Sequence, residues 1–138
     1  MLKIDTETMM IELTRSDSAW IVFSAVNSEG VPYEPTNNDV LVFSFAKKVG
    51  AEPIKQIENK FDENDPDPDV ADKWWTIEIK PEHTAGMKFG DYAYDVQIEG
   101  RDDVTDELVG VATIIGKTDE LSPTLRIWGE VSEESGEE

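Results

Sequence analysis

Apolar residues recur with a period of two along this chain, in short runs that turn-forming residues separate. Successive side chains of a strand point to opposite faces, so this alternation indicates strands that bury one face. The clearest example spans residues 92–98, where every second residue is aromatic or aliphatic and the others are small or polar. Apolar stripes at helical spacing are hard to find. The pattern therefore predicts an all-β fold.

About eight strands follow from this pattern. They cover residues 9–13, 19–26, 40–47, 54–61, 74–79, 92–98, 108–115 and 125–131. One short helical turn is expected over 81–88, because Pro81 suits a first helical position and Gly90 can end the turn. Because no helical crossovers intervene, the order favours an antiparallel, immunoglobulin-like β-sandwich over a βαβ architecture.

Two of these strands carry a prediction about their place in the sheet. Both faces of 19–26 hold large apolar residues, which predicts a central strand. In 54–61 the charges of Lys55, Glu58 and Lys60 predict a solvated edge strand. Charged side chains at this position hinder pairing of the strand with other chains. On the strand 40–47, Leu41, Phe43 and Phe45 share one face, and that face is expected in the core.

The length of 138 residues is that of one domain, large enough to bury a core without disulfides. We expect a single sandwich domain over residues 1–131 and an acidic, flexible tail over 132–138. The 31 acidic and 12 basic residues leave a net charge of −19, which would repel phosphate backbones, so nucleic acid is not an expected partner. Because cysteine is absent from the sequence, thiol nucleophiles and disulfides are excluded.

The first ten residues do not form a signal peptide, because they carry Asp5 and Glu7 and lack a basic start and a continuous apolar stretch. No run approaches the roughly 18 apolar residues of a spanning helix. We therefore expect a chain made in the cytoplasm, with no membrane insertion.

Catalytic residues, cofactors and metal sites are not expected. His83 is the only histidine, and a lone histidine is a weak basis for acid–base chemistry, so a surface position is expected. The segment 64–69 places carboxylates at alternate positions, as calcium loops do. It holds two prolines and lacks the glycine of such loops, which favours a solvated loop and leaves calcium as the alternative.

Tyr92 is the candidate for a structural corner, together with Tyr94 and Asp95. In immunoglobulin-like sandwiches a tyrosine just inside a strand, after a short turn, returns its hydroxyl group to the backbone and holds two segments together. The turn at 84–86 precedes Tyr92 in this way. The expected role of the three residues is structural.

The tryptophans provide a possible contact surface made of Trp74, Trp75 and Trp128. Trp74 and Trp75 are adjacent in a predicted strand, so they point to opposite faces and one of them can be exposed. Exposed tryptophans favour contact with sugars or proteins. The alternative is that both faces are covered, one by the opposing sheet and the other by a loop or a neighbouring subunit.

Several segments together resemble a known family. These are RSDSAW, GVPYEPTNNDVLVFSFAKK, TIEIKPEHTAGMKFGDYAYDVQIEG and VATIIGK. The chain from residue 9 to about 131 is similar to the small β-sandwich domain at the N-terminus of phage baseplate upper proteins and related prophage structural proteins. The most specific part is 90–98, where Tyr92, Tyr94, Asp95 and Gln97 match the tyrosine and tyrosine-aspartate-hydrophobic-glutamine run of that family.

The resemblance implies a non-enzymatic virion or prophage component that docks into a tail or baseplate through contacts with other virion proteins or with copies of itself. Longer members of the family carry receptor-binding regions beyond this domain. This chain ends soon after the sandwich, which leaves the role of an adaptor or decoration protein. The alternative is a carbohydrate-binding or surface-adhesion module, which the tryptophan and tyrosine content favours.

Overall fold

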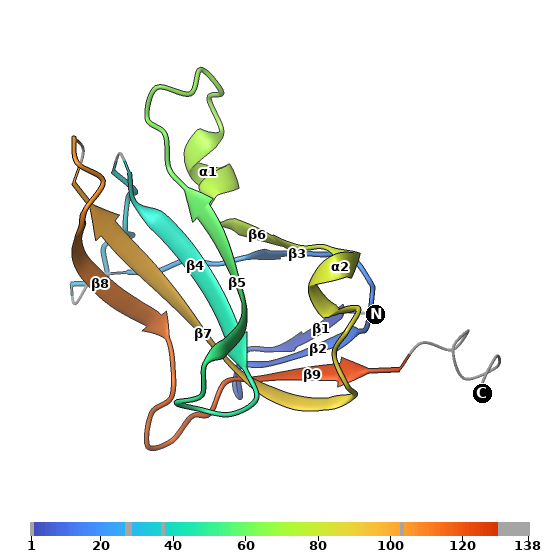
Figure 1. The fold of residues 1–138 in the computed structure, drawn as a ribbon. Coiled ribbons are helices and arrows are strands. Elements are labelled where there is room, and N and C mark those ends of the chain that lie inside the picture. The colour runs from blue at the N-terminus through green and yellow to red at the C-terminus, as the bar shows by residue number, and fades with distance from the viewer. Residues whose placement is uncertain (1, 27–28, 37, 103, 130–138) are drawn as a thin grey trace.

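The structure is a computed structural model that describes residues 2–26, 29–36, 38–102 and 104–129 (Figure 1). Nine strands and two short helices are assigned within these residues. They are β1 (Leu2–Asp5), β2 (Met10–Thr14), β3 (Ala19–Val22), β4 (Val40–Ala46), β5 (Pro53–Lys60), α1 (Val70–Trp74), β6 (Thr76–Ile79), α2 (Pro81–Thr84), β7 (Gly90–Arg101), β8 (Leu108–Ile115) and β9 (Thr124–Trp128). The expected tail at 132–138 and the end of the last expected strand lie outside the described residues.

The strands form two sheets. The larger has the order β1-β2-β9-β7-β4-β5, with β8 also paired to β7, and the smaller consists of β3 and β6. Along one side of β7, β9 pairs with its first four residues and β8 pairs with its second half, so the two short strands share that side. The chain changes sheet after β2, after β3, after β5 and after β6, as it does in immunoglobulin-like sandwiches. The predicted fold class is confirmed.

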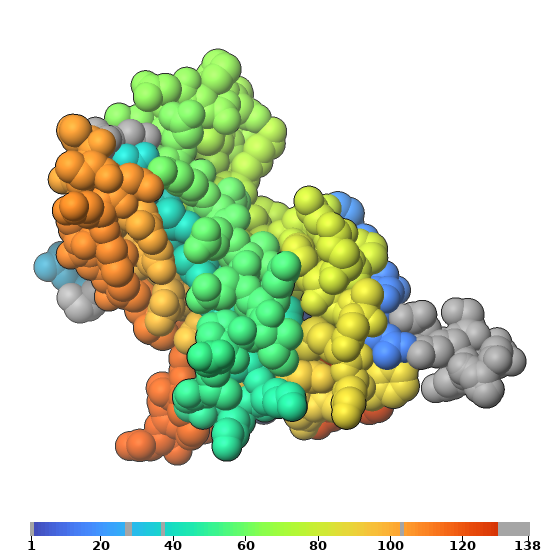
Figure 2. All heavy atoms as spheres, viewed as in Figure 1, coloured from blue at the N-terminus to red at the C-terminus, as the bar shows by residue number. Residues whose placement is uncertain are grey.

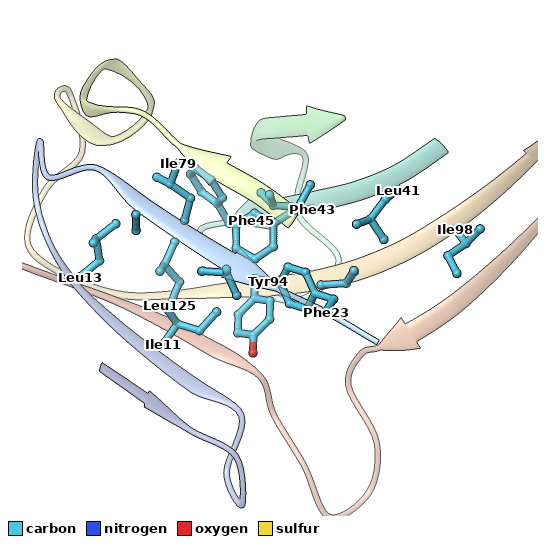
Figure 3. Close-up of a cluster of buried hydrophobic side chains, with 14 of the residues drawn as sticks. Ile11, Leu13, Phe23, Leu41, Phe43, Phe45, Ile79, Tyr94, Ile98 and Leu125 are labelled. Atoms are coloured by element: carbon cyan, nitrogen blue, oxygen red, sulfur yellow. The ribbon is translucent and has the colours of Figure 1, made fainter. Parts of the chain in front are cut away.

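The core lies between the two sheets. Leu41, Phe43 and Phe45 of β4 are buried, as their shared face predicts. Figure 3 shows side chains from β2, β4, β6, β7 and β9 that meet in this layer. The Phe43 ring lies 5.4 Å from that of Tyr94. Burial of each large apolar side chain contributes about 1.5–3 kcal/mol to folding.

One pair of the described strands is parallel, whereas the strand pattern predicted an antiparallel sandwich. Met10–Thr14 of β2 runs alongside Thr124–Trp128 of β9 in the same direction. A short hairpin would impose an antiparallel direction, but β2 and β9 come from opposite ends of the described chain, so no hairpin joins them. β1 was not expected either. It precedes β2 in an antiparallel hairpin, and Leu2 and Ile4 are exposed there.

The prediction that 19–26 forms a central strand is wrong. β3 ends at Val22, and among the described strands it pairs only with β6. Trp20 and Val22 are 62% and 70% exposed. The smaller sheet packs on the larger one through one face only, so the other face of β3 is left to solvent. The apolar residues on both faces therefore do not indicate a strand buried on both sides.

The remaining predictions about elements agree in part with the structure. β5 ends the path of the larger sheet, which confirms the edge strand. The helical turn is confirmed in its first half, since α2 starts at Pro81 and ends at Thr84. Residues 74–75 do not belong to a strand, because α1 ends at Trp74 and β6 begins only at Thr76.

Candidate functional site

Tyr92 and Tyr94 connect β7 to segments outside it. The Tyr92 hydroxyl donates a hydrogen bond of 2.6 Å to the carbonyl of Lys88, which joins the start of β7 to the segment after α2. The Tyr94 hydroxyl donates a 2.6 Å bond to the carbonyl of Met9, and burial raises the pKa of Tyr94 to about 12. Asp95 is half-buried, and this burial raises the pKa of its carboxyl group.

Trp74 does not belong to a contact surface. It is 2% exposed, because the end of α1 directs it into the core instead of along a strand. Its ring packs against those of Tyr33 and Phe61, at 6.4 and 6.2 Å, and against Trp75 at 4.8 Å. The expectation that the two adjacent tryptophans point to opposite faces of a strand is therefore wrong.

Trp128 lies on β9, separate from the pair at the end of α1. Its indole N–H donates a 3.0 Å hydrogen bond to Glu12, and the Arg126 guanidinium lies 5.6 Å from its ring centre. Trp75 is half-buried and contacts Tyr33 with its ring edge at 6.3 Å. The structure thus does not gather Trp74, Trp75 and Trp128 into one surface.

His83 and the aspartate-rich loop both bond to nearby groups of the chain. The Nδ1 atom of His83 accepts a 2.8 Å hydrogen bond from the backbone N–H of Lys80 at the start of α2, and burial lowers the pKa of His83. Asp65 and Asp67 each accept a hydrogen bond from the backbone N–H two positions further on. Among the described residues, no cluster of three or more acidic, histidine or cysteine side chains could hold a metal ion.

The outer edge of β8 is a feature that was not expected from the sequence. All eight residues of β8 are uncharged, and among the described strands β8 pairs with β7 alone. Leu108, Val109 and Val111 are exposed, with Val109 at 70%. In Figure 2 the orange β8 segment forms one margin of the molecule. Such an edge presents backbone donors and acceptors that can pair with another strand.

β5, at the end of the sheet path, has a different composition. It carries Lys55, Glu58 and Lys60, and charged side chains on an edge strand hinder pairing with other chains. In Figure 1, β8 and β5 lie on opposite sides of the β7–β4 pair. Of these two strands, β8 is the one without charged side chains.

A groove of about 780 Å³ adjoins β8. It is bounded by β8, by the second half of β7, and by Ser24–Val26 together with Tyr33. The groove exists because β3 ends at Val22, so the smaller sheet does not reach this end of the larger one. Gly100 of β7 is paired with Gly110 of β8, and neither has a side chain to fill the space.

One wall of the groove is held by a hydrogen bond between Tyr33, which is exposed, and the buried Asp39. The Tyr33 hydroxyl donates a hydrogen bond to Asp39, which is 4% exposed, and the backbone N–H of Thr36 donates a 3.0 Å bond to the same carboxylate oxygen. Burial, and then the hydrogen bond to Asp39, raises the pKa of Tyr33 to about 12. The Tyr33 hydroxyl is therefore protonated at neutral pH and donates its proton to the hydrogen bond with Asp39.

Comparison of the chain with protein-family models, curated proteins and solved structures finds no match. In the part of the chain that the structure describes, no helix is long and apolar enough to cross a membrane. The uncharged β8 edge and the groove beside it are thus the features from which a function can be inferred.

Proposed function

We propose that this chain is a non-enzymatic structural protein of a phage or prophage, a tail or baseplate component or adaptor that assembles through protein–protein contacts. Its location is then the virion, and its partners are other virion proteins. The observation that carries the proposal is the uncharged outer edge of β8, with which no other described strand pairs, beside an apolar groove. Exposed apolar surface of this kind is typical of interaction sites.

The composition of the groove supports binding over catalysis. Of the described residues that line it, none is histidine, aspartate, glutamate, lysine or arginine. Its hydroxyl groups come from Ser24, Tyr33 and Thr113. A hydroxyl nucleophile needs an adjacent base, and the carboxylate that Tyr33 contacts is the buried Asp39 behind the wall.

The assignment to a phage is supported by the resemblance of residues 90–98 to the phage baseplate family. Tyr92 and Tyr94 of that segment each hold β7 to another part of the chain through a hydrogen bond. Such a structural role is what we expect of a motif that is shared because of the fold. The specific role in a tail comes from the resemblance alone.

The proposal is tested by the protein content of phage particles. Particles from a host that carries this gene should contain the chain in a fixed ratio to the tail proteins after gradient purification, as measured by quantitative mass spectrometry. A chain that stays in the soluble fraction and never sediments with particles would contradict the proposal. A host cytoplasmic protein, followed in the same fractions, controls for carry-over.

A second candidate is carbohydrate binding, which the exposure of Trp20 favours. Trp20 is 62% exposed and lines a groove of about 460 Å³ with charged side chains that include Glu58 and Lys80. An exposed indole beside polar groups is a suitable platform for a sugar ring. A glycan array should show binding that Trp20→Ala abolishes and that the exposed Trp128→Ala retains. A flat array would exclude this candidate.

A further inference from the structure

The edge of β8 can accept one more strand along its length. β8 has eight residues, which is enough for a full strand pairing. In antiparallel or parallel pairing the main-chain hydrogen bonds supply the affinity and do not depend on the sequence of the added strand. The exposed side chains at 108, 109 and 111 are apolar, and no residue of β8 is charged. No charged side chain of β8 therefore opposes the added strand.

The groove gives such a strand a place for its side chains. Ile98 is buried on the inner face of β7, and Gly100, two residues later, lies on the same face. Gly110, its partner on β8, shares that face, and a Cβ atom built at Gly110 meets no atom within 4 Å. Every second side chain of a strand added to β8 would therefore reach open apolar space.

Charge identifies the kind of partner. The chain carries a net charge of −19. Glu107 directly precedes β8, and the segment after β8 carries one lysine, Lys117, and two acidic residues, Asp119 and Glu120, so both flanks are net negative. A second copy paired through β8 would bring two chains of like charge together. A segment with basic residues at its ends would be attracted to these flanks.

We infer that the β8 edge binds an extended segment of another protein as an added strand, with apolar side chains in the groove and basic residues at both ends. This inference rests on the proposed function and names the class of partner that the assembly contact requires. The added strand extends the larger sheet beyond β8.

The test uses the full chain and a synthetic peptide of about nine residues, a length typical of strands. The peptide alternates valine and threonine between two lysines at each end. We expect titration calorimetry to detect binding, and hydrogen exchange to show slower exchange at the β8 amides. The same peptide with glutamate ends should bind at least about tenfold more weakly, a loss of about 1.4 kcal/mol.

Two substitutions locate the binding site. Val109→Lys places a charge on the edge, as lysine does on β5, and Gly110→Val fills part of the groove floor. Each should weaken peptide binding by about tenfold or more. Val22→Lys is the matched control, because Val22 lies on β3 with the same 70% exposure as Val109. It should bind the peptide like the unmodified chain. Melting temperatures verify that all three variants fold.

Several outcomes would overturn the inference. They are no binding of the lysine-ended peptide, protection of amides outside β8, equal binding of the glutamate-ended peptide, or a dimer of the chain that Val109→Lys dissociates. The proposed function fails separately, when the chain is absent from particles. If Val109→Lys enters particles in unchanged amounts, the proposed function stands and the inference about β8 fails.

Discussion

At the scale of single residues, Tyr92 shows how one hydroxyl group joins two segments. Its bond to the Lys88 carbonyl spans the junction between α2 and β7, where the chain passes from the smaller sheet to the larger. Phenylalanine at this position would keep the ring and remove this bond.

Replacement of this hydroxyl group tests its role. Tyr92→Phe should lower the free energy of unfolding by about 1 kcal/mol, the usual net value of a neutral hydrogen bond. Tyr33→Phe should cost more, about 1.5–3 kcal/mol, because it removes a donor from the buried carboxylate of Asp39. Urea denaturation measures both values. An unchanged midpoint for Tyr92→Phe would remove this bond from the account of the fold.

Asp95 provides a prediction about pH. Burial raises the pKa of its carboxyl group, so the folded state binds the proton more tightly than the unfolded state. This shift stabilises the fold at pH below the unfolded pKa of about 3.9, and the contribution is lost as the pH rises through the folded pKa. At neutral pH the charged group therefore disfavours folding.

Asp95→Asn should stabilise the protein at pH 7, by less than about 1 kcal/mol because the side chain keeps part of its hydration. The gain should disappear near pH 3, as thermal melting at both pH values would show. Asp91→Asn is the control of opposite sign. Arg126 lowers the pKa of Asp91 by hydrogen bonding, so this substitution should destabilise at pH 7 and have little effect at low pH. Destabilisation by Asp95→Asn at pH 7 would contradict the prediction.

At the scale of elements, β7 depends on the conformation of its first residue. Gly90 has φ of +137°, in a region that other residues rarely adopt. This conformation sets the direction in which the chain enters β7, the strand that pairs with β4, β8 and β9.

Gly90→Ala should therefore destabilise the protein by about 1–3 kcal/mol, the cost of a strained backbone conformation. Gly110→Ala is the matched control, because an added Cβ meets open space and its φ lies outside the strained region. It should be neutral or stabilising by up to about 1 kcal/mol, through lower entropy of the unfolded chain. Differential scanning calorimetry measures both. Equal effects of the two substitutions would contradict this account.

Strands formed by short apolar runs between turn-forming residues could be predicted from the sequence. β8 has the predicted bounds, and β2 and β4 differ by about a residue at their ends. Trp74 could not be placed, because it comes just before the alternating residues of β6 and so resembles the start of that strand. The helix α1, which ends at Trp74, is too short to be recognised from its sequence. Trp20 could not be placed either, because exposure of one face of β3 depends on how few strands its sheet contains.

The candidate site was beyond prediction for a similar reason. The groove forms where the smaller sheet stops short of β8, and this depends on the arrangement of both sheets in space. One signal was present in the sequence, since 108–115 is a run of eight uncharged residues directly after an acidic turn. Sequence alone does not show which side of that strand lacks a neighbour.

At the scale of the whole molecule, charge is the dominant property. Among all residues of the chain, acidic side chains exceed basic ones by 19 charges. A folded state concentrates these charges in a smaller volume than the unfolded chain does, so their mutual repulsion disfavours folding.

Salt should therefore stabilise the protein at pH 7. We expect the melting temperature to rise as sodium chloride increases from about 10 mM to about 200 mM, where the Debye length falls below about 10 Å. The same series near pH 4.2, the isoelectric point, should show a smaller rise because little net charge remains to be screened. An equal rise at both pH values would indicate a salt effect unrelated to net charge.

The parallel pair between β2 and β9 has a consequence for synthesis on the ribosome. β9 lies between β2 and β7 in the larger sheet, and its Leu125 and Ile127 are buried. At about 5–20 residues per second, β2 waits for several seconds in the nascent chain before β9 is made. Ile11 and Leu13 of β2 lack their partner strand during that time. Closure of the larger sheet is therefore a late event, and a nascent chain that stops before residue 124 leaves β2 without its place between β1 and β9.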